Sequence, residues 1–217
     1  MAESRLLKKD LFGEIWQISA GKQVHIVRDA STANSCVRWL AQRLLQREAR
    51  VLAALEFIDG VPQLVDLDTQ QLSRTYLPGL PMQRSKPRDP RYFKAAAGLL
   101  RRLHRNNVVH NDLAKEPNIL VRDDGSPAFI DFQLAWFAPQ RGRLFRLLAY
   151  EDLRHLLKHK RLYCPEYLTQ RELGILDNPS CASRTYRSTV KPVYLFITRR
   201  ILGWADREGA ANRGDQD

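Results

Sequence analysis

The sequence predicts an α+β fold in which a small strand-rich N-terminal part with one long helix precedes a mainly helical part. Two short apolar stretches rich in β-branched residues flank a glycine turn near the N-terminus, and a long run of helical periodicity follows them. The second half alternates further helical patterns with a single hairpin signal. No stretch approaches the ~20 consecutive apolar residues that a membrane-spanning helix needs.

Each element of the N-terminal part follows from a local pattern. The turn Ala20-Gly21 joins the first two predicted strands, and helical periodicity predicts a helix over 37–57. The turn Pro78-Gly79 closes the strand-rich part. The four predicted strands cover 11–18, 23–28, 61–68 and 72–77.

The second part reads as helices interrupted by one hairpin. A basic, proline-rich connector covers 81–90, and two apolar strands surround Asp124-Gly125 in the hairpin ILVRDDGSPAFIDF. The tail 205–217 is expected to fray. The predicted helices cover 92–104, 144–159 and 191–204.

The composition is that of a globular protein, with 44% apolar and 27% charged residues, but the charge is strongly basic. A net charge of +11 favours anionic partners such as nucleotides, phosphorylated sugars or acidic lipid. The region from Arg84 to Arg105 holds eight basic residues and one acid. No nucleic-acid-binding signature appears, so a nucleic-acid partner is not expected. The N-terminus carries charges where a secretory signal needs an apolar core, so we expect a cytoplasmic protein.

Glu48 occupies the centre of the apolar face of the helix predicted over 37–57. A carboxylate in that position needs a cationic partner or must take up a proton. Arg28, at the end of the preceding strand, can supply the cation across elements; a local pair with Arg47 or Arg50 is the alternative. The apolar neighbours at helical offsets are Leu44, Val51, Leu52 and Leu55.

A second group of polar residues surrounds the hairpin. The motif His110-Asn111-Asp112 follows a short strand, and a carboxylate there can orient an attacking hydroxyl or accept its proton. The hairpin returns Asp131 to the end at which Asn118 begins, so an amide and a carboxylate side by side predict a divalent-metal site. An ordinary polar turn is the alternative, because Asp and Asn are common in turns.

Taken together, these segments resemble the protein-kinase-like superfamily. VVHNDLAKEPNILV is similar to the catalytic loop H-R-D-L-x-x-x-N, and IDFQ is similar to D-F-G. HIVR and REARVL resemble the strand lysine and the helix glutamate of the small lobe. The resemblance covers about residues 10–160 and is closest to small bacterial serine/threonine kinases with RIO-type and lipopolysaccharide-kinase-like features. It implies one reduced two-lobed domain over 1–217, with an N-lobe at 1–77 and a C-lobe at 78–217.

The resemblance implies a role for each matching residue of the loop and hairpin. Asp112 would be the catalytic aspartate, and Lys115 would contact the transferring phosphate. Asn118 and Asp131 would hold Mg²⁺. Asp152, in the helix predicted over 144–159, would support the catalytic loop.

The same resemblance implies an ATP site. Arg28 stands where the family has lysine, and Glu48 would anchor it against the nucleotide phosphates. Tyr76 and Leu77 would lie at the hinge where adenine binds. No G-x-G-x-x-G precedes the first strand, and the glycine of D-F-G is replaced by Gln133.

The implied activity is an ATP- and Mg²⁺-dependent transfer of phosphate to a hydroxyl, most simply on serine or threonine of a protein. Two alternatives remain open. One is a kinase of a phosphorylated sugar or lipopolysaccharide core at the inner membrane face, which the apolar and basic segment 190–204 could contact peripherally. The other is a nucleotide-binding pseudokinase that serves as a scaffold.

Overall fold

The computed structural model describes residues 3–21 and 23–178. The chain divides into two units, Met1–Asp177 and Asn178–Asp217, and all helices and strands named below belong to the first unit. The fold is mixed α+β, with a strand-rich sheet first and helices after it, which confirms the predicted fold class at that level. The helix expected over 191–204, the apolar and basic segment 190–204 and the tail 205–217 lie outside the described residues.

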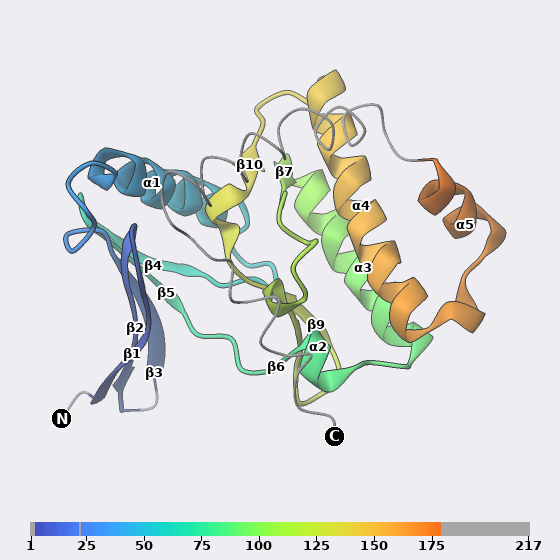
Figure 1. The fold of residues 1–217 in the computed structure, drawn as a ribbon, viewed down its shortest axis with the longest axis horizontal. Helices are drawn as coiled ribbons and strands as arrows, with labels where there is room; N and C mark the ends of the chain where they lie inside the picture. Colours follow the sequence, from blue (N-terminus) through green and yellow to red (C-terminus); the bar gives the residue numbers. More distant parts are fainter. Residues whose placement is uncertain (1–2, 22, 179–217) are drawn as a thin grey trace. The chain divides into compact units, whose positions relative to one another are not determined.

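An antiparallel five-stranded sheet forms the N-terminal part (Figure 1). Its spatial order is β1-β2-β3-β5-β4, and helix α1, Arg38–Ala54, lies in the chain between β3 and β4 and packs on the sheet. The sequence patterns missed β1 because its side chains are exposed on both faces and show no alternation. The strands are β1 Glu3–Asp10, β2 Gly13–Ala20, β3 Gln23–Asp29, β4 Leu64–Leu67 and β5 Gln71–Thr75.

The register of β3 against β5 determines which side chains meet α1. Arg28 is paired with Leu72, and Ile26 is paired with Arg74. Because side chains alternate along a strand, these four share one face of the sheet, and all four are buried. The sheet therefore presents two arginines, as well as apolar side chains, to the helix that carries Glu48.

Helices α3, Pro90–Arg105, and α4, Arg143–Tyr163, pack side by side in the second part (Figure 1). Asp89 caps α3 by accepting from the Arg91 backbone N–H at 2.8 Å. The apolar face predicted for this helix is buried, with Phe93, Ala96, Leu99, Leu100 and Leu103 in the main core. The helical elements of this part also include α2 Met82–Ser85, α5 Gln170–Asp177 and the 3₁₀ turns η1 Glu116–Asn118, η2 Phe132–Leu134 and η3 Pro165–Tyr167.

Short strands join these helices. The predicted hairpin is present, with Gly125 in the left-handed region at φ 77° in its turn. Strand β6 adds to the hairpin edge, and β7 pairs separately with β10. The strands are β6 Leu80–Pro81, β7 Val108–Val109, β8 Ile119–Val121, β9 Pro127–Phe129 and β10 Trp136–Phe137. Among the described residues, no helix is both long enough and apolar enough to cross a membrane.

Gly13 is required by a close approach of two strands, and its replacement provides a test of the sheet. Its φ is 120°, and a Cβ atom would stand 1.9 Å from the Asp29 carbonyl oxygen. We expect Gly13→Ala to lower the free energy of unfolding by about 1–3 kcal/mol for backbone strain and by a further ~1–3 kcal/mol for overpacking. Gly21→Ala is the matched control in urea unfolding, because a Cβ there meets no described atom within 4 Å. An equal loss in the two variants would contradict the close approach.

Helix α4 carries a histidine that makes the stability depend on pH. Burial, assisted by the nearby Lys158 charge, lowers the pKa of His155 to about 4 from a usual value of 6.5. As the pH falls from about 6.5 to about 4, the unfolded chain binds a proton that the native protein excludes. We therefore expect the free energy of unfolding to decline over that range, by up to ~1.4 kcal/mol per pH unit for this residue. Urea melts at several pH values should show a shallower decline for His155→Gln, and an unchanged slope would count against this assignment.

Candidate functional site

Glu48 is fully buried in α1 between two arginines of the sheet. Its Oε2 lies 3.5 Å from Arg28 Nε, and its Oε1 lies 3.4 Å from Arg74 Nε. The pair predicted between Arg28 and Glu48 across elements is thus present. The local alternative with Arg47 is not, because the Arg47 guanidinium donates to the carbonyl oxygens of Leu134 and Ala135.

Arg74 is the site residue that the sequence analysis missed. It is 7% exposed, and burial lowers its pKa while the Glu48 carboxylate opposes that shift. The pattern LSRTYL held the signal, because alternation puts Arg74 on the same face as the apolar Leu72. The Nε atoms of Arg28 and Arg74 and both Glu48 oxygens are buried without a well-formed hydrogen bond, so these three side chains attract one another by charge and not through hydrogen bonds between those atoms.

Arg28 also reaches the second part of the fold. Its Nη2 lies 3.3 Å from Oδ1 of Asp131, a residue 103 positions away in the chain. Burial by itself would raise the pKa of Asp131, but the positive charges of Arg28 and Arg74 outweigh it and hold that pKa below its usual value. Asp131 is therefore an ionised carboxylate at neutral pH, within reach of the sheet arginines.

Asp131 has a left-handed backbone, with φ 62° and ψ 72°, immediately before η2. A residue with a Cβ adopts this conformation at a cost of about 1 kcal/mol or more, and such strain collects at functional sites. The next residue, Phe132, is fully buried and packs against the His110 ring at 4.7 Å between centroids. The buried phenylalanine thus anchors the turn that aims the Asp131 carboxylate.

The loop after β7 holds Asp112, Lys115 and Asn118 together. Asn118 Nδ2 donates to the Asp112 carbonyl oxygen at 3.0 Å and to its Oδ2 at 2.8 Å. Lys115 Nζ lies 3.0 Å from the same Oδ2. Because both of its N–H groups are used, Asn118 is oriented with Oδ1 away from Asp112, and no described residue donates a hydrogen bond to that oxygen.

Asp152, in α4, supports this loop from inside the protein. Its Oδ2 accepts from the His110 backbone N–H at 2.7 Å, and its Oδ1 accepts from the Asn111 N–H at 2.9 Å. His104 Nε2 adds a contact at 3.3 Å. Asn111 takes a left-handed backbone at φ 63°, which asparagine tolerates better than most residues. The carboxylate of α4 therefore sets the backbone direction just before Asp112.

The His110 side chain links the loop to the hairpin. Its ring packs against Phe129 and Phe132, and Nε2 lies 3.1 Å from the Ile130 carbonyl oxygen. Burial lowers the pKa of His110, so the ring is neutral and Nε2 donates this bond. The Ile130 N–H donates in turn to the Asn118 carbonyl oxygen at 3.0 Å. These contacts hold Asn118 beside the residue that precedes Asp131.

The outer side of the same loop is fastened to the end of α4. Tyr163 OH donates to Glu116 Oε2 at 2.6 Å, and His159 Nε2 lies 2.8 Å from the Leu113 carbonyl oxygen. Burial and the bond to Glu116 raise the pKa of Tyr163. The loop is one residue longer than the motif it resembles, and these α4 contacts hold the longer loop in place. No sequence pattern pointed to them.

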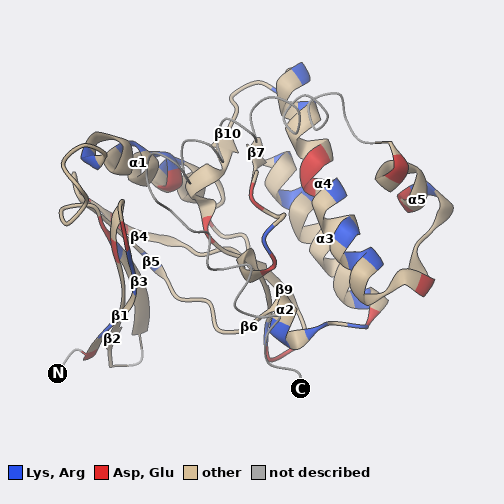
Figure 2. Ribbon diagram, in the orientation of Figure 1, with Lys and Arg blue, Asp and Glu red and all other residues tan. Residues whose placement is uncertain are grey.

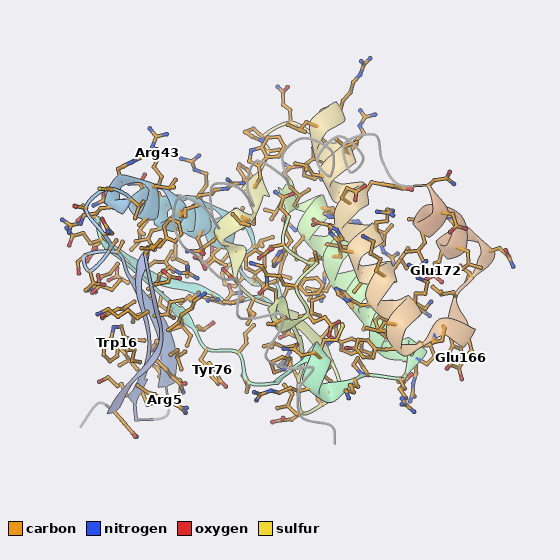
Figure 3. All side chains as sticks on the ribbon, in the orientation of Figure 1. Arg5, Trp16, Arg43, Tyr76, Glu166 and Glu172 are labelled. Atoms are coloured by element: carbon orange, nitrogen blue, oxygen red, sulfur yellow. The ribbon has the colours of Figure 1, made fainter. Side chains whose placement is uncertain are left out.

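The structure brings together all of the predicted site residues except those expected at a hinge. Tyr76 is half-exposed on the connection that follows β5 (Figure 3), and its N–H donates to the Val24 carbonyl oxygen at 3.0 Å. The residues that gather form two groups, which together we call the charged cluster: Arg28, Glu48, Arg74 and Asp131, and Asp112, Lys115 and Asn118. The groups meet at the hairpin end, where the Ile130 N–H donates to the Asn118 carbonyl oxygen and the Lys115 charge acts on Asp131. Among the described residues, neither Tyr76 nor Leu77 has a hydrogen bond or ion pair with the charged cluster.

Comparison of the chain with protein-family models and with curated protein sequences found no match.

Within the described part of the chain, no group of three or more His, Cys, Asp or Glu side chains is arranged to hold a metal ion. Mg²⁺ does not need such a group, because it is commonly bound by one or two carboxylates together with substrate phosphates and water. Asp131 offers an ionised carboxylate, and Asn118 offers an amide oxygen without a hydrogen bond from the described residues. This donor set fits Mg²⁺ brought in with a phosphate ligand, and it is too sparse for a metal held by protein alone.

Proposed function

We propose that this protein is an ATP- and Mg²⁺-dependent phosphotransferase that moves the γ-phosphate to a hydroxyl, with serine or threonine of a protein as the acceptor. The observation that carries the proposal is the 3.3 Å contact between Arg28 and Asp131, which joins the sheet with its buried Glu48 to the hairpin end. That contact unites two sets of residues whose order along the chain resembles the kinase motifs. Cations and a metal-binding carboxylate at one place are what phosphoryl transfer requires.

We also propose that the fold is a reduced, two-lobed protein-kinase-like domain. In support, the sheet has five antiparallel strands, and α1 enters the chain between the third and fourth of them. The helical part holds the loop, the hairpin and the supporting Asp152 in the order that the resemblance requires. The segment between Asp131 and α4 contains only a 3₁₀ turn and a two-residue strand, so an activation segment is missing.

In the proposed nucleotide site, Arg28 binds phosphate, and Arg74 makes this possible. A single cation beside Glu48 would be neutralised by that carboxylate, whereas two cations leave one positive charge in excess. Asp131 balances that excess in the absence of a ligand. Buried charges need partners, so a phosphate oxygen is a natural substitute for the Asp131 carboxylate on Arg28.

In the proposed transfer step, Asp112 orients the acceptor hydroxyl and accepts its proton, and Lys115 contacts the phosphoryl group. Asn118 keeps Asp112 in position through its bond to Oδ2. Asn118 Oδ1 and Asp131 would hold Mg²⁺, which supplies charge neutralisation on the phosphates. The bond made at phosphorus by the hydroxyl oxygen replaces the bond to ADP, and the hydroxyl proton passes to Asp112.

A kinase of a phosphorylated sugar or of lipopolysaccharide is the second candidate, favoured by the missing activation segment on which an extended peptide would lie. A nucleotide-binding scaffold is the third, favoured by the pairing of Arg28 with the very carboxylate that should bind metal. The three candidates differ in turnover and acceptor, so one assay distinguishes them.

The assay incubates the full-length protein with γ-labelled ATP and Mg²⁺ in the presence of separated protein, lipopolysaccharide and small-sugar fractions. We expect Mg²⁺-dependent label in protein, and we expect Asp131→Asn to abolish that label. Asp123→Asn, an exposed change in the hairpin turn, is the control and should be fully active. Label confined to a sugar fraction selects the second candidate, and thermal stabilisation by ATP without any transfer selects the third.

A further inference from the structure

A groove of about 730 Å³ lies beside the charged cluster and has no role in the proposed transfer step. It runs between α1, β10 and the start of α4, and Asn111, the residue before Asp112, is part of its lining. Its volume is within the range of about 300–1,000 Å³ that is usual for ligand sites. The apolar lining comes from Val51 together with Leu40, Leu44, Trp136, Phe137, Leu144 and Leu148.

The charge at the groove has one sign. Three arginines of α1, Arg43, Arg47 and Arg50, line it, and no acidic residue of the described chain does. Figure 2 shows basic positions on α1 and at the start of α4, and in Figure 3 the Arg43 side chain points away from the sheet. Glu48, the one acid of α1, is fully buried between two cations and does not line the groove. An anionic partner is therefore indicated.

The apolar side chains of the groove are also incompletely covered. Leu144 is 56% exposed at its edge, and Leu40, Leu44 and Leu148 are only partly buried. Large apolar residues that gather beside cations are typical of a surface that binds an amphipathic partner. The partner must then offer apolar side chains as well as negative charge.

The arginines and leucines of the groove share a helical spacing, which favours a peptide helix over a single lipid headgroup. Arg47 donates to two backbone carbonyl oxygens, and the Arg43 guanidinium lies 5.8 Å from the centre of the Trp39 ring. Arg43 and Arg50 are both exposed and are seven residues apart, which is about 10 Å along a helix. Two carboxylates placed two turns apart on a partner helix match that spacing, one to each arginine. Leu40 and Leu44 on one side, and Leu144 and Leu148 on the other, repeat with the helical period into which a third helix packs.

We propose that this groove, the α1–α4 groove, docks an acidic amphipathic helix of the protein acceptor. The assignment of the partner as acceptor rests on the proposed function, whereas the binding itself does not. Docking here would hold the acceptor next to Asp112 through the neighbouring Asn111. The groove would bind the acceptor in place of an activation segment, because the segment between Asp131 and α4 is too short to hold an extended peptide.

The test uses a fluorescein-labelled synthetic helix of about 15 residues, with leucines on one face and glutamates two turns apart on its flanks. Fluorescence polarisation is measured against the full-length protein without nucleotide. We expect binding that weakens with salt, and a loss of roughly tenfold or more in affinity for Arg43→Glu/Arg50→Glu. Leu144→Glu should also weaken binding, since it places a carboxylate beside the apolar face of the peptide.

Arg101→Glu/Arg105→Glu is the matched control, because it makes the same charge change on an exposed face of α3. We expect this variant to bind the acidic peptide as the wild type does. An equal loss in both double variants would show a response to net charge and overturn the proposal. Binding to anionic phosphatidylglycerol vesicles but not to the peptide would also overturn it.

A second readout separates this proposal from the proposed function. Thermal stabilisation by ATP and Mg²⁺ is measured on the same proteins, and Arg43→Glu/Arg50→Glu should keep it in full. Absence of that stabilisation in the wild type contradicts the nucleotide site and leaves the peptide result standing. Failure of the wild type to bind the peptide, with stabilisation by ATP intact, contradicts the groove alone.

Discussion

Asparagine in place of Asp112 is expected to lower the turnover of phosphate transfer about 10²–10⁴-fold, the usual contribution of a positioned acid–base group. The change removes the proton acceptor and keeps the shape of the side chain. In the wild-type protein, Asn118 Nδ2 donates to the Asp112 carboxylate at 2.8 Å, and the amide oxygen of the variant can still accept this bond. The fold and the affinity for ATP should therefore change little, and steady-state kinetics should show the loss in kcat.

Asp123→Asn is the control, since it makes the same chemical change on an exposed residue of the hairpin turn. Urea unfolding of both variants checks that the loop is intact. The smallest loss expected on removal of an acid–base group is about 10²-fold. If Asp112→Asn lost less than about tenfold in turnover, Asp112 would have no acid–base role. A loss that appeared only in KM would assign Asp112 to binding.

Glu48→Ala is expected to give the largest loss of stability, about 3–5 kcal/mol, because it leaves buried cations without their shared partner. Arg28 would keep Asp131 at 3.3 Å, but Arg74, which is 7% exposed, would have no other ion pair among the described residues. The free energy of unfolding from urea titration measures the effect. Glu56→Ala, an exposed change just beyond the same helix, should alter it by less than about 0.5 kcal/mol.

Glu48→Leu combined with Arg74→Met shows whether charge balance or packing is responsible. This pair removes one anion and one cation together and leaves Arg28 with Asp131. Replacement of a buried ion pair by apolar residues of similar volume is often neutral. We therefore expect the double variant to be more stable than Glu48→Ala. A double variant as unstable as Glu48→Ala would contradict the ion-pair account.

Local periodicity in the sequence was sufficient to predict much of the fold and one contact between distant elements, the pair of Arg28 with Glu48. The helix bearing Glu48, the hairpin and the apolar face of α3 each depend on residues close together in the chain, so their patterns could be followed in the sequence. The pairing of Arg28 with Glu48 also followed, since a carboxylate on an apolar helix face needs a cation. Strand β1 could not be found in this way, because its exposed charged residues lack alternation.

The remaining parts of the site depend on contacts that no local pattern encodes. Alternation in LSRTYL places Arg74 on the face of Leu72, but its contact with Glu48 depends on the register between β3 and β5, which is a property of the assembled sheet. The hydrogen bond from Tyr163 to Glu116 joins residues that are 47 positions apart in the chain. The position of Tyr76 and Leu77 outside the charged cluster likewise depends on the path of the chain after β5. Their proposed contact with adenine stays a prediction.

The turn after Asp131 is tied on two sides. Arg47 and Asn111 both donate to the Leu134 carbonyl oxygen, and Gln133 takes the place where the resembling motif has its flexible glycine. These two bonds, and the side chain at Gln133, restrict rearrangement of the turn. If the chain is a kinase, this turn would not switch it to an inactive conformation. Its activity in the cell would then be controlled by the amount of protein made and by the supply of acceptor.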